Sequence, residues 1–368
     1  MKHLIIYKNK DRYSSFPLLK QLDDRILIGF FTAPVPDHMG LFKWNVLVSF
    51  DEGITWGFAG IHDYEDWDWP ANSPRERSDM FTCSLGKSKI ATGSYGFKAR
   101  QISTSTSSAS GPLTDKSQIT KSTSLFHRWS PDNWQETIYQ RFYEVPGVDI
   151  IVTFPRFLEF LNIILIPAYA ILSDYDDISR CFVWRSDDHG KTFRLWNMFP
   201  DGIDGNEMAF IRTKDERILA HIRSDNHPYL MESWSYDYGL TWTYPTHVYS
   251  EAVGNIIGGP PHLLRLKDNR ILCSYGYRRQ PMGIRAIISE DEGETWQAPI
   301  ILRDDAGYAS SLHKEKWLWS KFRFSKPNPA MDCGYPVSIQ LEDESILTAY
   351  YITCEDRITG IEATKWKV

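Results

Sequence analysis

Short apolar runs alternate with polar turns along most of the chain. Residues 16–27 (FPLLKQLDDRIL) place a charged turn between two apolar runs, and residues 261–272 (PHLLRLKDNRIL) repeat the pattern closely. Two short apolar runs around a polar turn are typical of a β-hairpin rather than of a helix. Related segments end at Ile90-Ala91, Ile164-Leu165, Ile218-Leu219 and Ile346-Leu347. The pattern therefore predicts six strand–turn–strand units, each followed by a third strand.

A second repeat of the form S-x-D-x-G-x-T-(W/F) follows four of these units. Its copies are residues 49–56, 186–193, 235–242 and 289–296. Asp and Ser side chains can hydrogen-bond nearby backbone N–H groups and close a tight turn, and Gly supplies a positive φ. The aromatic residue at the end is expected to pack into the adjacent sheet. We interpret the repeat as a structural turn.

This repeat resembles the Asp-box, or BNR repeat, of the sialidase superfamily. The resemblance, together with the six units, predicts an all-β fold: one six-bladed β-propeller domain over residues 1–368, with four-stranded antiparallel blades. It implies that the boxes lie on the face opposite the active site. The sixth unit ends at the C-terminus, so the first strand of the chain is expected to complete its sheet.

The repeat also aligns positions at the start of each unit. The first strand of a propeller blade lines the central channel, so equivalent positions are expected to form a ring near its mouth. Counting twelve residues back from Leu27 and its counterparts gives Ser15, Asp79, Thr153, Glu207, Pro260 and Tyr335. Within this ring, Glu207 and Tyr335 have side chains suited to catalysis.

The resemblance to sialidases extends to these side chains. Sialidases carry a Glu at the start of the fourth blade and an Arg about sixteen residues later, and Glu207 and Arg223 match that pair. The nucleophilic Tyr of the family opens the sixth blade after a Gly, as Tyr335 does after Gly334. The resemblance implies that Glu207 takes the phenol proton, so that Tyr335 attacks an anomeric carbon beside a carboxylate.

The chain departs from the family where sialidases bind the substrate carboxylate. An Arg-Ile-Pro of the first blade is replaced here by Ser15-Phe16-Pro17, and Arg12, three residues before Ser15, is a candidate substitute. The third arginine of the family has three candidates, which the sequence leaves open: Arg278, Arg279 and Arg285.

Further candidate residues complete the predicted pocket. The family's acid/base Asp lies in a loop of the first blade, where Asp37 and His38 stand, and either can transfer a proton near neutral pH. His262 opens the fifth blade, and Asp79 approaches from the second. Trp67 offers a flat apolar face for sugar stacking.

Charge and composition narrow the class of partner. The net charge is −6 and the chain has no long Lys/Arg run, which disfavours nucleic acid. No stretch reaches the roughly 18 apolar residues that span a bilayer. Five widely spaced cysteines without a Cys-x-x-Cys pair, and an apolar N-terminal run too short for a signal peptide, favour a cytoplasmic location. No nucleotide or metal motif appears, so no cofactor is expected. A homo-oligomer stays possible.

Taken together, these residues predict a carbohydrate-active enzyme. The leading hypothesis is a sialidase-like exo-glycosidase, a hydrolase of O-glycosyl bonds acting on an acidic or uronate-containing oligosaccharide. Two alternatives stay open: a rhamnosidase or rhamnose–glucuronate lyase that uses His38 and His262, and a propeller that binds glycans without turnover.

Overall fold

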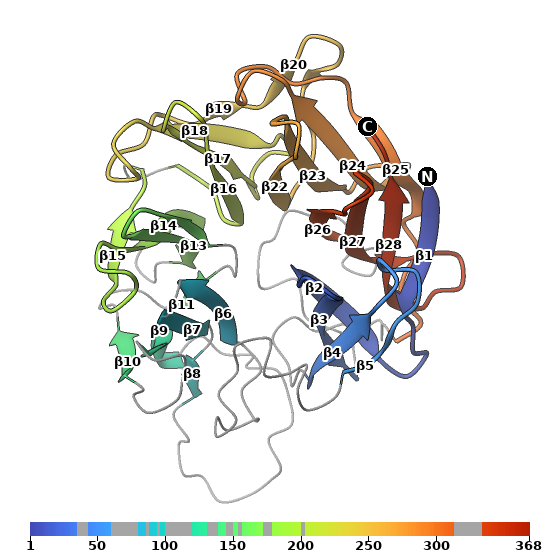
Figure 1. Ribbon diagram of the computed structural model, residues 1–368, viewed down its shortest axis with the longest axis horizontal. Coiled ribbons are helices and arrows are strands. Elements are labelled where there is room, and N and C mark those ends of the chain that lie inside the picture. Colours follow the sequence, from blue (N-terminus) through green and yellow to red (C-terminus); the bar gives the residue numbers. More distant parts are fainter. Residues whose placement is uncertain are drawn as a thin grey trace, which may run out of the picture. The chain divides into compact units, whose positions relative to one another are not determined.

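The computed structural model describes residues 1–34, 43–59, 157–171, 179–199, 203–312 and 333–368, and the backbone of six strands between residues 80 and 153. All elements of these residues are β-strands (Figure 1). These described strands form six antiparallel sheets of four or five strands each, and a further pair of them forms a small hairpin. Within the described residues, no helix is long and apolar enough to cross a membrane. The all-β propeller prediction is confirmed.

The chain divides into two compact units. The first comprises residues 1–36, 42–67 and 205–368, and the second comprises residues 37–41 and 68–204. Four sheets belong to the first unit and two to the second. The prediction of one domain over residues 1–368 stays a prediction.

The four sheets of the first unit each have four strands, in sequence order in three of them, whereas in the last sheet the N-terminal strand lies next to the C-terminal one. Two of them consist of β2 (Tyr13–Gln21), β3 (Ile26–Ala33), β4 (Lys43–Ser49) and β5 (Gly57–Phe58), and of β16 (Met208–Arg212), β17 (Ile218–Ile222), β18 (Met231–Ser235) and β19 (Thr246–His247). The third contains β22 (Pro261–Arg265), β23 (Ile271–Tyr277), β24 (Met282–Ser289) and β25 (Ile300–Ala306). The fourth contains β26 (Gly334–Gln340), β27 (Ile346–Thr353), β28 (Thr359–Trp366) and β1 (Lys2–Tyr7).

The second unit holds two five-stranded sheets. One contains β6 (Met80–Leu85), β7 (Ser88–Gly93), β8 (Gly96–Ala99), β9 (Ile119–Ser130) and β10 (Tyr139–Glu144). The other contains β11 (Ile150–Thr153), β12 (Leu158–Phe160), β13 (Ile163–Ile171), β14 (Ser179–Ser186) and β15 (Arg194–Asn197). The small hairpin of β20 (Tyr249–Ser250) and β21 (Gly254–Asn255) lies in the first unit.

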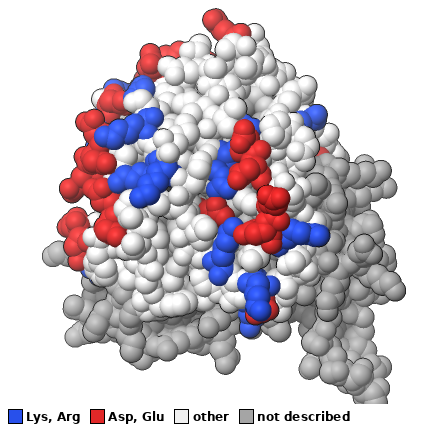
Figure 2. Space-filling model, turned by 90° about the vertical axis from the view of Figure 1, so that its right-hand side faces the viewer, with Lys and Arg blue, Asp and Glu red and all other residues white. Residues whose placement is uncertain are grey.

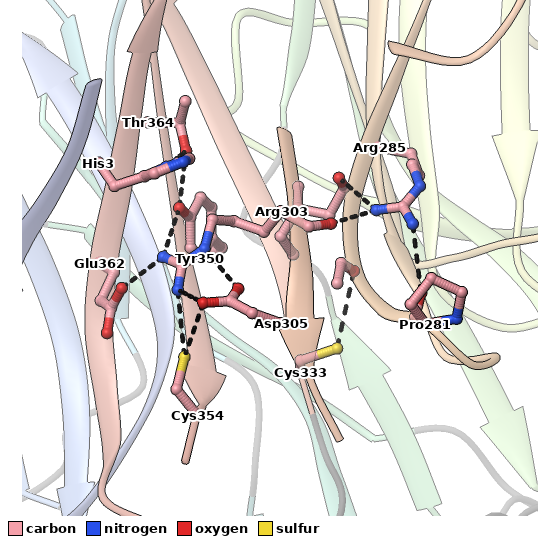
Figure 3. A network of polar contacts seen from close by, with 12 residues as sticks. His3, Pro281, Arg285, Arg303, Asp305, Cys333, Tyr350, Cys354, Glu362 and Thr364 are labelled. Atoms are coloured by element: carbon pink, nitrogen blue, oxygen red, sulfur yellow. Dashed lines mark hydrogen bonds and ion pairs between the residues drawn. The ribbon is translucent and has the colours of Figure 1, made fainter. Parts of the chain in front are cut away.

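The N-terminal strand completes the last sheet, as predicted. β1 pairs antiparallel with β28, so the first and last strands of the chain lie side by side (Figure 1). Arg303 of β25 joins this sheet to its neighbour, because its guanidinium bonds the carboxylates of Glu362 and Asp305 and the hydroxyl of Tyr350 (Figure 3). His3 of β1 meets Thr364 within the same network (Nδ1–Oγ1 3.1 Å).

The core of the first unit lies between neighbouring sheets. One apolar cluster joins β16 and β17 to β22 and β23, with Leu219 and Ile271 fully buried. Another joins β23 and β24 to β27, with Leu272 and Ile346 fully buried. The short apolar runs of the sequence therefore form strands whose side chains pack between the sheets.

Each Asp box closes a turn by the same hydrogen bonds, as residues 235–242 between β18 and β19 illustrate. Ser235 Oγ donates to Asp237 Oδ1 (2.9 Å) and accepts the N–H of Gly239 (2.7 Å). The same carboxylate accepts the N–H of Thr241 (2.8 Å) and the Thr241 hydroxyl. Burial alone would raise the pKa of Asp237, but the bonds from Thr241 and Ser235 lower it below its usual value. The box residues therefore serve folding.

The glycine of the box packs against the preceding sheet. A Cβ on Gly293 would lie 2.6 Å from Leu219 Cδ2, and one on Gly53 would lie 2.6 Å from Leu347 Cδ2. Both glycines also have a positive φ, +97° and +83°. The box thus requires glycine for two reasons, its backbone conformation and its contact with the neighbouring leucine.

Charged side chains of both signs lie together on the surface. On the face drawn in Figure 2, Lys and Arg alternate with Asp and Glu in two bands, with mostly uncharged surface between them. Several surface ion pairs join neighbouring sheets of the first unit, such as Arg217 with Glu294 and Lys365 with Glu52. Among the described residues of this face, neither sign dominates.

Candidate active site

Glu207 and Tyr335 form a buried hydrogen-bonded pair in the first unit. Glu207 lies directly before β16, and Tyr335 is the second residue of β26. The Tyr335 hydroxyl donates to Glu207 Oε1. Only 4% of Glu207 and 8% of Tyr335 are exposed. The structure therefore brings together the two residues that the sequence predicts to be the base and the nucleophile.

Arg223 binds the other oxygen of the same carboxylate. Its Nη1 donates to Glu207 Oε2 at 2.6 Å, and its Nη2 donates to Asp225 Oδ1 at 2.8 Å. Burial alone would lower the pKa of Arg223, but the charges of Glu207 and Asp225 raise it well above its usual value. The guanidinium therefore stays charged and fixes the orientation of the carboxylate that faces Tyr335.

Backbone pairing at the end of the sheet holds these side chains in place. The N–H of Arg223 donates to the carbonyl of Glu207, and the N–H of Asn206 donates to the carbonyl of Arg223, both at 2.9 Å. The Asn206 amide donates to Asp225 Oδ2 at 2.6 Å and its oxygen accepts the Glu207 N–H. Asp225 thus binds two side chains of the site, and its position is set by both.

An irregular backbone directs Tyr335 toward Glu207. The register of β26 and β27 shifts between Gly334 and Val337, which marks a β-bulge, and Tyr335 has a φ of +49°. A positive φ is costly for a bulky residue, and bulges commonly re-aim a side chain beside a site. Gly334 has a φ of +135°, a conformation that other residues rarely adopt. The backbone conformation of the bulge therefore explains why a glycine precedes Tyr335.

Phe16 repeats this arrangement in the adjacent sheet. It too has a positive φ (+55°) in a bulge and precedes a proline. Its ring meets that of Tyr335 edge to face, with centroids 4.6 Å apart. Ser15, the ring position expected from the sequence, pairs with Phe31 much as Gly334 pairs with Tyr351. The counterpart of Tyr335 is therefore Phe16, because the turn after β2 is one residue shorter than the turn after β26.

Among the three candidates for the third arginine, Arg278 lies against Tyr335. Its guanidinium carbon is 5.9 Å from the centre of the Tyr335 ring, and its Nε donates to the carbonyl of Cys333 at 3.0 Å. Arg285 is buried instead against the Tyr277 ring (4.8 Å) and donates to backbone carbonyls. Arg279 is exposed. Of the three, Arg278 is therefore the arginine that lies beside Tyr335.

Of the other predicted residues, the structure describes contacts of His262 and Arg12. His262 Nδ1 accepts the backbone N–H of Ser338 at 3.4 Å, a contact between neighbouring inner strands. Arg12 is exposed at the turn before β2, where its N–H donates to the carbonyl of Asn9. Asp37, His38, Asp79 and Trp67 lie outside the described residues.

Two residues of the cluster were not predicted, Asp225 and Phe16. Asp225 follows Arg223 by two positions, a spacing that would allow one ion pair at a strand end. Phe16 stands before a proline, as Tyr335 does, and that shared pair of residues was the available signal. Among the described residues, no group of three or more His, Cys, Asp or Glu side chains could hold a metal ion.

The fold and site define a class: an Asp-box β-propeller with a Tyr–Glu pair and two arginines that each follow the second strand of a sheet. Residues 157–350, more than half of the chain, match the family model described as BNR repeat-like domain. The chain therefore belongs to the BNR repeat-like family of sialidase-like propellers. No curated protein matches the sequence significantly.

Solved structures agree on the fold. A protein of unknown function from Dyadobacter fermentans has a TM-score of 0.71 at 20% identity, covering 100% of this chain and 98% of that chain. The sialidase of Trypanosoma rangeli has a TM-score of 0.56 at 12% identity, covering 96% of this chain and 55% of its own. A leech intramolecular trans-sialidase has a TM-score of 0.58 at 12% identity, covering 100% and 70%. The chain thus spans about half the length of the trypanosomal enzyme.

Proposed function

We propose that this protein is a carbohydrate-active enzyme, a sialidase-like exo-glycosidase in which Tyr335 is the nucleophile and Glu207 is its base. The observation that carries the proposal is the bond from the Tyr335 hydroxyl to Glu207 Oε1, with Arg223 on the opposite oxygen. A buried phenol that donates to a fixed carboxylate is arranged to lose its proton as it attacks.

The reaction follows from this pair. Tyr335 Oη attacks the anomeric carbon while the glycosidic C–O bond breaks, and the phenol proton passes to Glu207. The departing oxygen takes a proton from a general acid, for which Asp37 and His38 are the candidates from the sequence. Water then attacks the same carbon, returns a proton to the acid's conjugate base, and releases the tyrosine, which recovers its proton from Glu207.

The charges of the site favour an acidic substrate. A carboxylate nucleophile would be repelled by a negative group beside the anomeric carbon, whereas a neutral phenol is not. Arg223 and Arg278 place positive charge on two sides of Tyr335. Ser15 stands where sialidases have their first-blade arginine, and Phe16 beside it adds an apolar wall next to Tyr335, so we propose an acidic or uronate-containing oligosaccharide other than the sialosides that a three-arginine site would select.

The test is turnover of aryl glycosides and acidic oligosaccharides by the purified protein and by Tyr335→Phe and Glu207→Gln. Tyr350→Phe is a matched control, because it removes a buried phenol hydroxyl from the same sheet, and that hydroxyl bonds Thr364 and Arg303 instead of Glu207. We expect Tyr335→Phe and Glu207→Gln each to lose activity by at least about a hundredfold. Tyr350→Phe is expected to keep it.

Other outcomes distinguish the alternatives. Full activity in Tyr335→Phe would reject the nucleophile assignment. A product that absorbs in the near ultraviolet would indicate a lyase. Glycan binding without turnover of any substrate by the wild type would identify a binding propeller.

A further inference from the structure

We propose that an aromatic platform at the edge of the sheet of β16 to β19 binds a neutral sugar ring of the substrate, next to the acidic sugar at Tyr335. The platform consists of His227, Tyr229 and His247, with Asn255 beside it. This inference deepens the proposed function and rests on it, since it adds a second subsite to the Tyr335–Glu207 site.

The topology of the sheet places the platform on the same edge as the site. Met208 pairs with Ile222, Ile222 with Met231, and Met231 with His247, so one row crosses β16, β17, β18 and β19. Glu207 and Arg223 adjoin the inner end of this row. Strands lie about 4.8 Å apart, so three steps put β19 roughly 14 Å from β16. An oligosaccharide of a few residues can span that distance.

The connection between β17 and β18 bridges the two ends of the row. It leaves Arg223, passes Asp225 in the site and reaches His227 two residues later. Because two residues span at most about 7 Å, the backbone of His227 lies within that distance of Asp225. The platform is therefore continuous with the catalytic cluster, and the Asp box of this sheet closes the opposite edge, between β18 and β19.

The three rings of the platform meet at angles to one another. The centroid of Tyr229 is 4.9 Å from that of His247, and His227 is 5.2 Å from His247 and 6.2 Å from Tyr229. His247 and Asn255 are exposed, and His227 and Tyr229 are half-buried. The Asn255 amide donates to His247 Nδ1 at 3.1 Å, with its own oxygen as a further polar group.

Hydrogen bonds of the backbone make the platform rigid. Leu230 donates to the carbonyl of Ile256 (2.8 Å), Ile256 to that of Val248 (2.9 Å), and Val248 to that of Leu230 (2.9 Å). Gly258 donates to the carbonyl of Pro228 at 3.0 Å. The segments that carry all the rings are thus tied together, as a preorganised binding surface requires.

The chemistry of the platform suits a neutral sugar. Ring faces take the apolar C–H side of a pyranose, while imidazole and amide groups can bond its hydroxyls. No Lys or Arg belongs to the platform, and the carboxylate of Asp225 lies only two residues from His227, so nothing in the platform attracts a negatively charged second ring. The substrate is accordingly an acidic terminal sugar linked to a neutral hexose.

The test uses a printed glycan array probed with Tyr335→Phe, which cannot turn its ligand over. Adding Tyr229→Ala or His247→Ala to this variant is expected to weaken its binding about tenfold on glycans with a neutral hexose in the second position. Tyr244→Ala is the matched control, since Tyr244 is a tyrosine of the same sheet region that is 74% exposed and lies after the Asp box. It should leave binding unchanged. His247→Ala changes an exposed side chain, so it tests the platform even if Tyr229→Ala fails to fold.

Each outcome decides. Equal binding by all these proteins, or binding of no glycan at all, overturns the platform. Loss of binding in Tyr229→Ala and His247→Ala, combined with no turnover by the wild type, keeps the platform and rejects the proposed enzyme. Turnover that depends on Tyr335 but is unchanged by Tyr229→Ala and by His247→Ala supports the proposed enzyme and rejects the platform.

Discussion

Replacement of Gly293 by alanine should separate two costs that the Asp box imposes on this position. The φ of +97° disfavours any residue with a Cβ by about 1–2 kcal/mol. The added methyl would also lie 2.6 Å from Leu219 Cδ2, and Leu219 is fully buried and has little room to move. Overpacking of this kind costs about 1–3 kcal/mol. Gly293→Ala is therefore expected to destabilise the protein by about 2–5 kcal/mol in total.

Two other glycines serve as controls for each part of this cost. Gly254 has a φ of +77°, but the space that a Cβ would occupy there is open, so Gly254→Ala should lose only about 1–2 kcal/mol. Gly57 has neither a positive φ nor a neighbour within 4 Å, so Gly57→Ala should be neutral or slightly stabilising. Gly53→Ala should match Gly293→Ala, because its Cβ would meet Leu347 at the same 2.6 Å.

The assay is urea denaturation followed by tryptophan fluorescence, with the midpoint compared among the four variants. Leu219→Ala is added as a second background, in which the packing cost of Gly293→Ala should vanish and the φ cost should remain. Equal midpoints for Gly254→Ala and Gly293→Ala would refute the packing argument. An equal effect of Gly293→Ala in both backgrounds would refute it as well.

Three further predictions concern other parts of the first unit. Burial raises the pKa of Glu232 to about 8, so folding binds a proton between its ordinary value of 4.5 and about 8, and stability should fall as pH rises through that window; Glu232→Gln should flatten this dependence in denaturation curves measured across it. Arg303→Met removes one of the two cations that pair with the buried Glu362 carboxylate, Lys8 being the other, and should lower the free energy of unfolding by about 1–3 kcal/mol, with much of the loss recovered when Glu362→Gln is added. Phe16→Leu removes the ring beside Tyr335, and should lower kcat several-fold with KM nearly unchanged; a change in KM alone would contradict a positioning role.

The sequence was sufficient for the fold because the same physical demands recur in each sheet. Two apolar runs around a polar turn favour a hairpin. The Asp box needs Ser, Asp, Gly and Thr at fixed positions, so it can be recognised from the sequence alone. β16, β22 and β26 begin within a residue of the predicted starts at 207, 260 and 335. Pairing of β1 with β28 followed from the incomplete last unit.

The site was predicted less completely, because its geometry depends on irregular backbone. The Glu207–Arg223–Tyr335 constellation was expected, but a count of residues cannot register the bulge at Phe16 or a turn one residue shorter. Nor could spacing choose among three arginines, because the choice depends on where the end of β23 brings Arg278 relative to Cys333. Asp225 was missed because its importance comes from two partners, Arg223 after β17 and Asn206 before β16.

The most direct test of the central claim is to find the residue that carries the sugar during turnover. The responding substrate class would be supplied as an activated fluoroglycoside, which slows hydrolysis of a covalent intermediate, and the labelled protein would be digested and sequenced by mass spectrometry. The account predicts one added sugar on Tyr335, absent in Tyr335→Phe and diminished in Glu207→Gln. A label on any other residue, or turnover by the wild type with no covalent adduct, would contradict it.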